Sequence, residues 1–273
     1  MFYKLRNVSM AGACRLTWLN QRMEPTQRKS ILKVSTLLWG RSFRLRRSHW
    51  AIVTATSVVT VTGRLRFRRW LGERIRAARR YANDVATVAP TDDYAKKFFY
   101  FGNGAALMAP QGIIYNERYL SIGDETLIGP NVCLTAGISG DQEMLHAPVV
   151  TIGQKCIIGR GSHIIGHWSI TLGDEIQTGP YVYITDQNHT YLDIDTPVGW
   201  QTPEESAVSI GAGSWLGTNV VILPGTHLGL NTTVAAGAVV RGTFPDHAVL
   251  GGVPAKVLRH YSRESGWRSG PPA

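Results

Sequence analysis

The chain has 273 residues and a formal net charge of +10, with 29 Lys and Arg against 19 Asp and Glu. That length accommodates one large domain plus an appendage, and the Cys content excludes a disulfide-rich secreted scaffold. The charge is uneven: residues 1–80 hold 19 of the basic residues and two acidic ones, so this part carries +17 and the remainder −7.

Residues 1–63 form a basic leader. The apolar run at 51–62 is too short to span a bilayer and is half Thr, Ser or Ala, and no secretory signal precedes it. The leader suits contact with an anionic membrane surface or non-specific contact with nucleic acid. It contains no sequence-specific nucleic-acid module, and the other interpretation is a disordered leader or a start codon placed too far upstream. We expect a cytoplasmic protein, peripheral to the membrane if the leader binds lipid.

An amphipathic helix is expected over residues 64–88. Its apolar positions Leu71, Ile75, Ala78, Ala82 and Val85 follow three-and-four spacing, and Pro90 ends it. A shorter helix is expected just after Asp92 and Asp93. We predict that residues 64–104 are a helical cap over the first coil of the domain that follows.

From about residue 105 an apolar residue recurs every six positions. The clearest series follows residue 209: Ile210, Leu216, Ile222, Leu228, Val234 and Val240. Earlier series are Ile122, Ile128 and Leu134; Ile152, Ile158, Ile164 and Ile170; then, after a slip of two, Leu172, Thr178 and Ile184, with weaker echoes at Met108 and Ile114. Gly often follows the apolar residue, and the fifth place is small or β-branched. Short strands joined by tight corners fit this period, whereas the varied strand lengths of a β-sandwich do not, so we predict a β-helix.

Two stretches interrupt the repeat. The longer one begins within ITDQNHTY (184–191), and after Ile184 the repeat resumes only at Ile210. A shorter one covers residues 139–149. Long irregular loops on a rigid scaffold are usually functional or disordered, and the longer loop is too rich in aromatic residues for a flexible linker.

The pattern [LIV]-G-x-x-[STAV]-x resembles the hexapeptide-repeat acyltransferases over residues 105–260. With the NH of ITDQNHTY, SWLGTNVVILPG and GGVPAKVLR, the chain looks most like the sugar and xenobiotic O-acetyltransferase branch. The resemblance implies a left-handed β-helix that assembles as a homotrimer, with acyl-CoA, most often acetyl-CoA, in a groove between adjacent subunits. The domains expected are then 1–63 basic leader, 64–104 helical cap, 105–245 β-helix, and 246–273 a CoA-proximal segment and tail.

The resemblance also implies site residues. His189 is the general base of the NH motif and deprotonates an acceptor hydroxyl, a task that histidine can perform near neutral pH. Strand alternation, with His189 five places after Ile184, turns it away from the interior. Asp186 and Asn188 either orient that imidazole or shape the turn, and His167 and Tyr191 are expected on the acceptor side. The acceptor is expected to be a sugar, glycolipid or similar small hydroxyl compound, because aromatic and acidic side chains suit sugars.

The cofactor residues implied are Trp215 and Ala236 along the pantetheine arm, and Thr218, whose main-chain amide lies near the thioester. Arg241, Lys256 and Arg259 are expected at the phosphates. At Arg241 the sequence has VVRGTFP where the family often has VVTKDVP.

Two other functions fit a β-helix. A zinc carbonic anhydrase would use His163, His167 and His189, but that family spaces its close histidine pair by four residues and this chain has three. A non-catalytic assembly platform would not require the NH motif or the cation set. We expect no resident metal.

Overall fold

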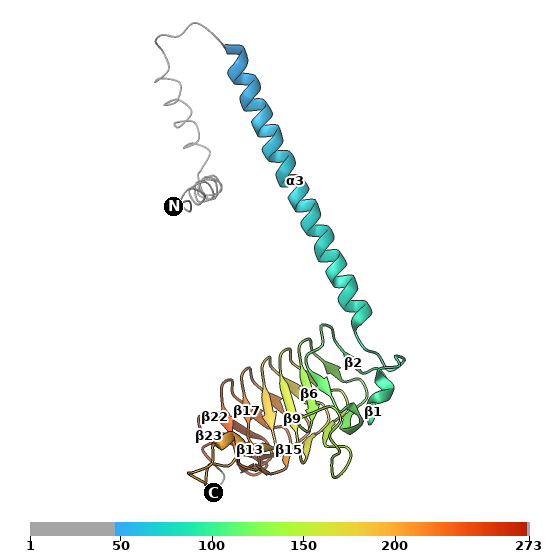
Figure 1. Cartoon of the computed structure of the whole chain (residues 1–273). Coiled ribbons are helices and arrows are strands. Elements are labelled where there is room, and N and C mark those ends of the chain that lie inside the picture. Colours follow the sequence, from blue (N-terminus) through green and yellow to red (C-terminus); the bar gives the residue numbers. More distant parts are fainter. Residues whose placement is uncertain (1–46, 272–273) are drawn as a thin grey trace. The chain divides into compact units, whose positions relative to one another are not determined.

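The computed structural model describes residues 47–271, with side chains from residue 64 onward. Three sheets of short strands form the sides of a triangular β-helix, and successive coils stack along one axis (Figure 1). Side 1 contains β1 (Tyr100–Phe101), β4 (Leu120–Ile122), β7 (Val150–Ile152), β10 (Ile170–Leu172), β15 (Val208–Ile210), β18 (His227–Leu228) and β21 (Thr243–Phe244).

The other two sides follow in chain order. Side 2 contains β2 (Ala106–Leu107), β5 (Leu127–Ile128), β8 (Ile157–Ile158), β11 (Gln177–Thr178), β16 (Trp215–Leu216), β19 (Thr233–Val234) and β22 (Ala248–Gly252). Side 3 contains β3 (Ile114–Tyr115), β6 (Cys133–Ala136), β9 (His163–Gly166), β12 (Tyr183–Thr185), β17 (Val221–Ile222) and β20 (Val239–Val240). All neighbours within these sets are parallel. The antiparallel strands β23 (Ala255–Ser262) and β24 (Gly266–Ser269) extend side 2 as a C-terminal hairpin.

The six-residue repeat sets the length of a coil. Ile210 pairs with Leu228, Leu216 with Val234, and Ile222 with Val240, so one regular coil of three sides takes three repeats. The repeated apolar side chains point inward and are buried from Ile122 to Val240. The predicted inward position at Met108 is wrong. The Met108 side chain is exposed, and the inward residue is Leu107, which pairs with Ile128. The expected β-helix is otherwise confirmed over this range.

Glycine at the second place of the repeat meets a need for close approach between coils. A Cβ on Gly211 would lie 2.5 Å from the backbone of Gly229 in the next coil. The left-handed backbone instead occurs two positions later, for example at Gly237 (φ 73°) and at Asn219 and Asn231 (φ 58° and 49°). Gly and Asn tolerate that conformation, so each corner uses two residues for two different steric reasons.

Three insertions leave the β-helix at the same corner, between side 3 and side 1. Ile122 pairs with Ile152, Ile152 with Leu172, and Leu172 with Ile210, so each of these three coils is longer than three repeats. The excess is largest in the coil that ends at Ile210 and smallest in the one that ends at Leu172. This smallest insertion is the slip of two noted in the sequence, and it lies at residues 167–169, just before β10, whose Ile170 and Leu172 both point inward. The corner is where an irregular structure can form a site.

The segment before the first coil differs from the expected helical cap. One helix, α3 (Arg47–Ala86), crosses the expected boundary at residue 63, and its described apolar side chains are exposed, 59% for Ile75 and 67% for Val85. Within the expected cap segment 64–104, residues that follow this helix meet the first coil: Val88 bridges Leu107, and Phe98 in the turn after the 3-10 helix η1 (Ala95–Lys97) is buried. No helix within the described residues is long and apolar enough to cross a membrane. Most of the expected leader, residues 1–46, lies outside the described residues.

Candidate active site

The longest insertion forms a two-stranded hairpin that carries the NH motif. Strand β13 (Gln187–His189) pairs antiparallel with β14 (Pro203–Glu205), and His189 lies opposite Pro203 while Gln187 lies opposite Glu205. Alternate residues of a strand share a face, so His189 and Glu205 lie on one face and Asn188 on the other. His189 is exposed, as its phase predicts, and the described residues provide no hydrogen-bond partner for its ring.

The loop at the tip of this hairpin is held by one buried amide. Gln201 donates from Nε2 to the carbonyls of Asp193 and Thr196, both at 2.8 Å, and its Oε1 accepts from the Asp193 N–H at 3.2 Å. The neighbouring short 3-10 helix η3 (Val198–Trp200) and Tyr191 are left exposed. The loop is therefore a defined structure that presents aromatic side chains to its surroundings.

Asp186 fixes the corner from which the hairpin leaves. Its carboxylate is fully buried and accepts hydrogen bonds from the backbone N–H groups of the 167–169 turn in the preceding coil. The distances are 2.8 Å and 3.1 Å from His167, 2.8 Å from Trp168 and 2.7 Å from Ser169. Asp186 was expected either to orient the His189 imidazole or to shape the turn, and every hydrogen bond that its carboxylate accepts within the described residues comes from the turn. Its role is to shape the turn.

His167 lies at the junction of two of the insertions. Its Nδ1 is 3.8 Å from the Glu205 carboxylate on β14, and its side chain is 8% exposed. Burial lowers the pKa of His167, and the nearby carboxylates of Asp186 and Glu205 oppose that change. Glu205 thus links His167 to the face of the hairpin that carries His189. No role was predicted from the sequence for Glu205 or Trp168, because neither residue belongs to a motif. The Trp168 ring lies 5.2 Å from that of His146.

The expected cofactor residues gather elsewhere on the β-helix. Trp215 points outward from β16 on side 2, and Thr218 and Ala236 occupy adjacent coils at the corner between sides 2 and 3. The Gly237 N–H donates to the Thr218 carbonyl at 2.9 Å, and within the described residues the Thr218 N–H has no acceptor.

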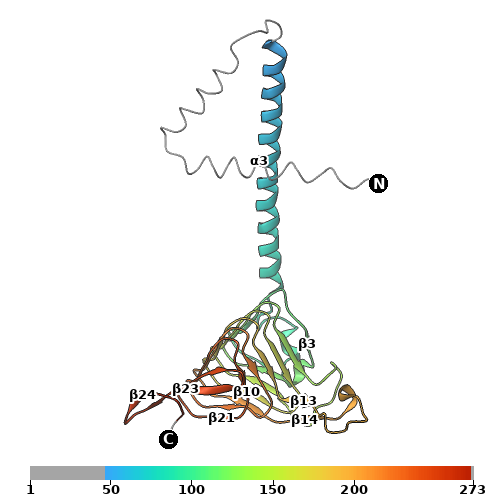
Figure 2. The ribbon, with the colours of Figure 1, turned by 90° about the vertical axis from the view of Figure 1, so that its left-hand side faces the viewer.

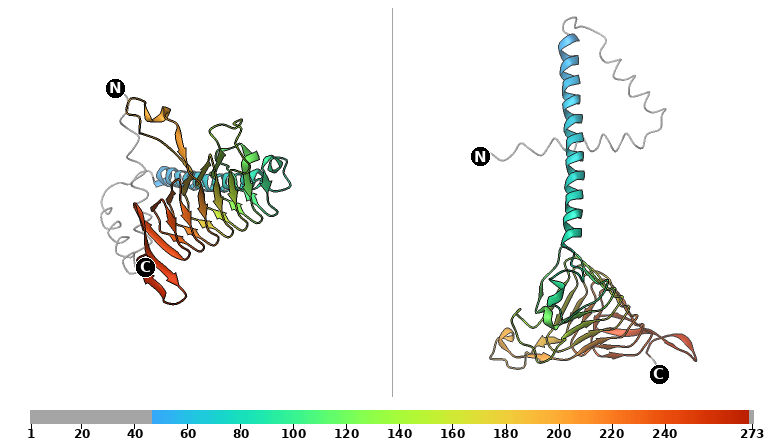
Figure 3. Two further views of the ribbon diagram at one scale, coloured as in Figure 1. Left: turned by 90° about the horizontal axis from the view of Figure 1, so that it is seen from below. Right: turned by 90° about the vertical axis from the view of Figure 1, so that its right-hand side faces the viewer.

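The expected phosphate contacts divide into two groups. Lys256 and Arg259 lie on β23, which extends side 2, and the Arg259 guanidinium lies 5.7 Å from the Trp267 ring. Arg241 follows β20 on side 3 and is separate from them. Figures 2 and 3 show the β13–β14 hairpin and the C-terminal hairpin at different corners of the triangle.

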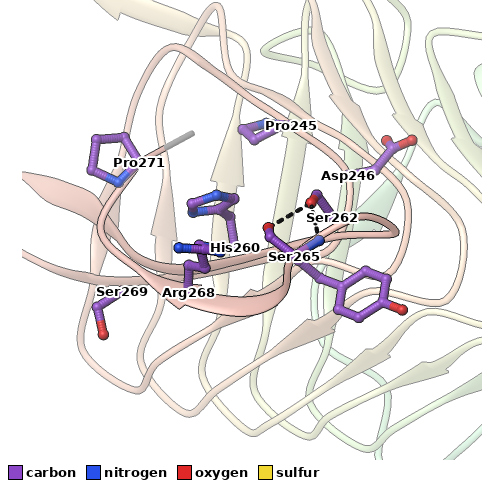
Figure 4. A pocket seen from close by; sticks show the side chains of 9 residues that line it. Pro245, Asp246, His260, Ser262, Ser265, Arg268, Ser269 and Pro271 are labelled. Atoms are coloured by element: carbon purple, nitrogen blue, oxygen red, sulfur yellow. Dashed lines mark hydrogen bonds between the residues drawn. The ribbon is translucent and has the colours of Figure 1, made fainter. Parts of the chain in front are cut away.

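A hollow of about 540 Å³ lies in the C-terminal region (Figure 4). It is lined by Pro245 and Asp246 of the last coil and by polar residues of the C-terminal hairpin, among them His260, Ser262 and Arg268. Its lining includes none of the expected catalytic or cofactor residues. The candidate active site is therefore the outward face of the hairpin and corners, which a single chain leaves open.

Histidines suited to a zinc site do not converge in one chain. His163 points outward from β9, with its ring 6.4 Å from that of Tyr183, whereas His167 faces Glu205. Within residues 64–271 no group of three or more His, Cys, Asp or Glu side chains is arranged to hold a metal.

Known proteins share both the repeat and the architecture. The family model described as bacterial transferase hexapeptide (six repeats) matches residues 207–242, and that described as hexapeptide repeat of succinyl-transferase matches residues 149–185. A putative lipopolysaccharide biosynthesis O-acetyl transferase, WbbJ of Escherichia coli K12, is 40% identical over 138 residues, 48% of this chain and 70% of that protein. The chain belongs to the hexapeptide-repeat acyltransferase family, in the sugar O-acetyltransferase branch. The expected enzyme class, an acyltransferase, is confirmed.

Two further relatives of this acyltransferase extend the comparison. The galactoside O-acetyltransferase of Escherichia coli K12 is 24% identical over 54% of this chain and 66% of its own length. The probable acetyltransferase Rv3034c of Mycobacterium tuberculosis is 30% identical over 62% of this chain, and the match spans about half (52%) of its length. Among solved structures, AntD, an N-acyltransferase from Bacillus cereus in complex with dTDP and 3-hydroxybutyryl-CoA, gives a TM-score of 0.52 at 18% identity, over 63% of this chain and 87% of that one. That likeness and the parallel sheets fit a left-handed β-helix.

Proposed function

We propose that this acyltransferase transfers the acetyl group of acetyl-CoA to a hydroxyl of a sugar, glycolipid or similar small acceptor. Two of the relatives bear O-acetyltransferase names, one of them a galactoside O-acetyltransferase. AntD, which shares the fold, is described with an acyl-CoA. The observation that carries the proposal is the exposed His189, held on a hairpin that leaves an otherwise regular β-helix.

His189 is the general base in this proposal. An acceptor hydroxyl is a weak nucleophile until a positioned group removes its proton as it attacks the thioester carbonyl. The oxygen of that carbonyl then becomes an oxyanion, the sulfur leaves as the CoA thiolate, and the acetyl group remains as an ester on the acceptor. An oxyanion requires a preorganised donor, and the Thr218 N–H is the group that we assign to it.

Acetyl-CoA binds along side 2 in this proposal. Trp215 and Ala236 flank a path for the pantetheine arm, and Lys256 and Arg259 on the same sheet are placed for phosphates. Arg241 is the third proposed phosphate contact, from side 3. Cationic ammonium and guanidinium groups suit phosphate recognition.

The complete site requires more than one chain. In a single chain His189 belongs to the corner between sides 3 and 1, whereas Thr218 and Ala236 belong to the corner between sides 2 and 3. The full width of side 3 separates these corners. We therefore propose a homotrimer in which the His189 hairpin of one subunit meets the side 2 groove of the next.

The acceptor lies against the hairpin face in this proposal. His167, buried beside Glu205, is the group that we assign to hydrogen bonding with an acceptor hydroxyl. Tyr191 offers an exposed aromatic surface for a sugar ring, and Asn188 lies on the opposite face of the hairpin, where it would serve a neighbouring subunit or a larger acceptor.

The decisive variant is His189→Ala. Removing a positioned general base typically lowers the rate by roughly 10²- to 10⁴-fold, whereas the acetyl-CoA groove is unchanged, so turnover falls and acetyl-CoA affinity stays close to that of the wild type. The measurements are CoA release with a panel of sugars, glycolipids and amines, and calorimetric titration of acetyl-CoA.

The matched control is His227→Asn, which replaces an exposed histidine on side 1 whose ring contacts the Ser209 hydroxyl at 2.8 Å. It is expected to retain turnover. Near-normal turnover of His189→Ala on an accepted substrate would move the base elsewhere. A wild-type chain that binds no acetyl-CoA would instead favour a non-catalytic platform.

A further inference from the structure

The second half of α3 is strongly basic and exposed. Residues 64–86 contain eight Arg and only two acidic residues, Glu73 and Asp84. The exposed fractions of the large apolar side chains are high as well, 59% for Ile75, 72% for Tyr81 and 67% for Val85. A soluble surface helix normally buries its apolar stripe, so the exposed side chains of Ile75, Tyr81 and Val85 need a partner.

Most of the apolar side chains lie within one arc of the helix, and Arg64 and Arg74 project from that same arc. At about 100° per residue, one face collects the apolar set and the opposite face collects arginines. The apolar face consists of Phe67, Trp70, Leu71, Ile75, Ala78, Tyr81, Ala82 and Val85, with Arg64 and Arg74 among them, and the opposite face includes Leu65, Arg66, Arg69, Arg76 and Arg80. The rings of Phe67 and Trp70 stack at 5.9 Å on the apolar face.

Such a face could bind a second copy of the helix or a lipid surface, and charge decides between these two partners. Copies of this helix would bring Arg64, which lies on the apolar face, and Arg68 and Arg79, which border it, next to identical arginines, and like charges at short range are unfavourable. An anionic bilayer surface offers phosphates to the arginines and an acyl boundary to the aromatic and aliphatic side chains.

We propose that residues 64–86 of α3 bind the surface of an anionic lipid bilayer, with the helix axis parallel to the membrane and the apolar face inserted at the acyl boundary. The inference extends beyond the acetyl transfer and does not depend on it.

The test is co-sedimentation of the full chain with vesicles of phosphatidylcholine plus phosphatidylglycerol, against vesicles of phosphatidylcholine alone. We expect binding to the anionic vesicles that weakens as salt is added. Each basic residue at such a surface contributes about fivefold in affinity, so Arg76→Gln with Arg80→Gln should weaken binding roughly 30-fold. The matched control, Lys155→Gln with Arg160→Gln, removes two charges from the β-helix and should leave binding unchanged.

A second variant tests insertion of the apolar face. Ile75→Ala keeps a good helix former and removes three carbons, which should weaken binding by up to roughly 50-fold if all three insert. Circular dichroism checks that the helix persists. Equal binding to both kinds of vesicle, or wild-type binding by both α3 variants, overturns the proposal. The proposal is also overturned if the α3 variants change the oligomeric state without changing vesicle binding. A DNA duplex that binds through α3 and is not displaced by vesicles overturns it as well.

Discussion

At the scale of single residues, a residue's position in the six-residue repeat predicts whether its side chain points outward, but its hydrogen-bond partners are set by the neighbouring coil. His189 is exposed as its place after Ile184 predicts. Asp186 was open to two roles in the sequence, and the structure gives it the backbone N–H groups of residues 167–169, which belong to the preceding coil. Such a contact depends on how two coils are stacked, which the residue pattern alone does not specify.

His167 makes the stability of the folded chain depend on pH. Burial lowers its pKa in the folded state below the ordinary value of about 6.5. Between the lowered and the ordinary value the unfolded chain therefore binds more protons, so the stabilisation present above about pH 6.5 is lost as the pH falls. We expect the melting temperature, measured by calorimetry, to decline with acid through this range.

The comparison is between two Asn variants. His167→Asn should flatten the decline, because no buried imidazole remains to be protonated, whereas His227→Asn should keep it. A His167→Asn profile parallel to that of the wild type would place the acid sensitivity in other groups.

At the scale of the coil, the six-residue spacing correctly predicts the inward residues from Ile122 to Val240 and the positions of both long loops. It fails where the repeat is irregular. Leu107 rather than Met108 points inward, because the first coil is longer than three repeats, as the Ala106–Leu127 pairing shows. The start of α3 at Arg47 also precedes the expected residue 64, since Thr and Ser at 54–62 are tolerated in a helix despite weak propensity.

The glycine at close approach between coils and the left-handed residue two positions later predict different outcomes when each is substituted. Gly211→Ala places a Cβ 2.5 Å from the backbone of Gly229, which is not a flexible side chain and cannot move aside. Overpacking of this kind costs about 3 kcal/mol, which lowers the melting temperature of a domain of this size by roughly 6 to 12 °C. Thermal unfolding followed by circular dichroism measures it.

The control is Gly237→Asn. Gly237 has open space around its Cβ position and a φ of 73°, and Asn occupies the same place in the repeat at residues 219 and 231. This variant should shift stability by less than about 0.5 kcal/mol. Equal losses for the two variants would show that close approach between coils is not what the second-place glycine provides.

At the scale of the molecule, the sequence motifs predict the residues of the site and leave their assembly unspecified. His189, the side 2 residues and the C-terminal cations lie in separate motifs, and the structure keeps them at separate corners of one chain. The hollow beside the C-terminal hairpin includes none of them. In the proposed function, a second copy completes the site that brings both substrates together, so the motifs indicate the chemistry and the subunit arrangement is a proposal.

Subunit mixing tests that arrangement directly. His189→Ala removes the base and keeps the groove, while Ala236→Trp fills the groove at an exposed corner residue and keeps the base. Each variant alone should be nearly inactive. In co-expressed, randomly mixed trimers, an interface is intact when its His189 comes from an Ala236→Trp subunit and its groove comes from a His189→Ala subunit. About a quarter of the interfaces meet both conditions, so about a quarter of wild-type activity should return. Mixing the separately purified proteins without subunit exchange is the control. If co-expressed mixtures, confirmed as mixed trimers by two affinity tags and light scattering, stay inactive, then base and groove act within one chain.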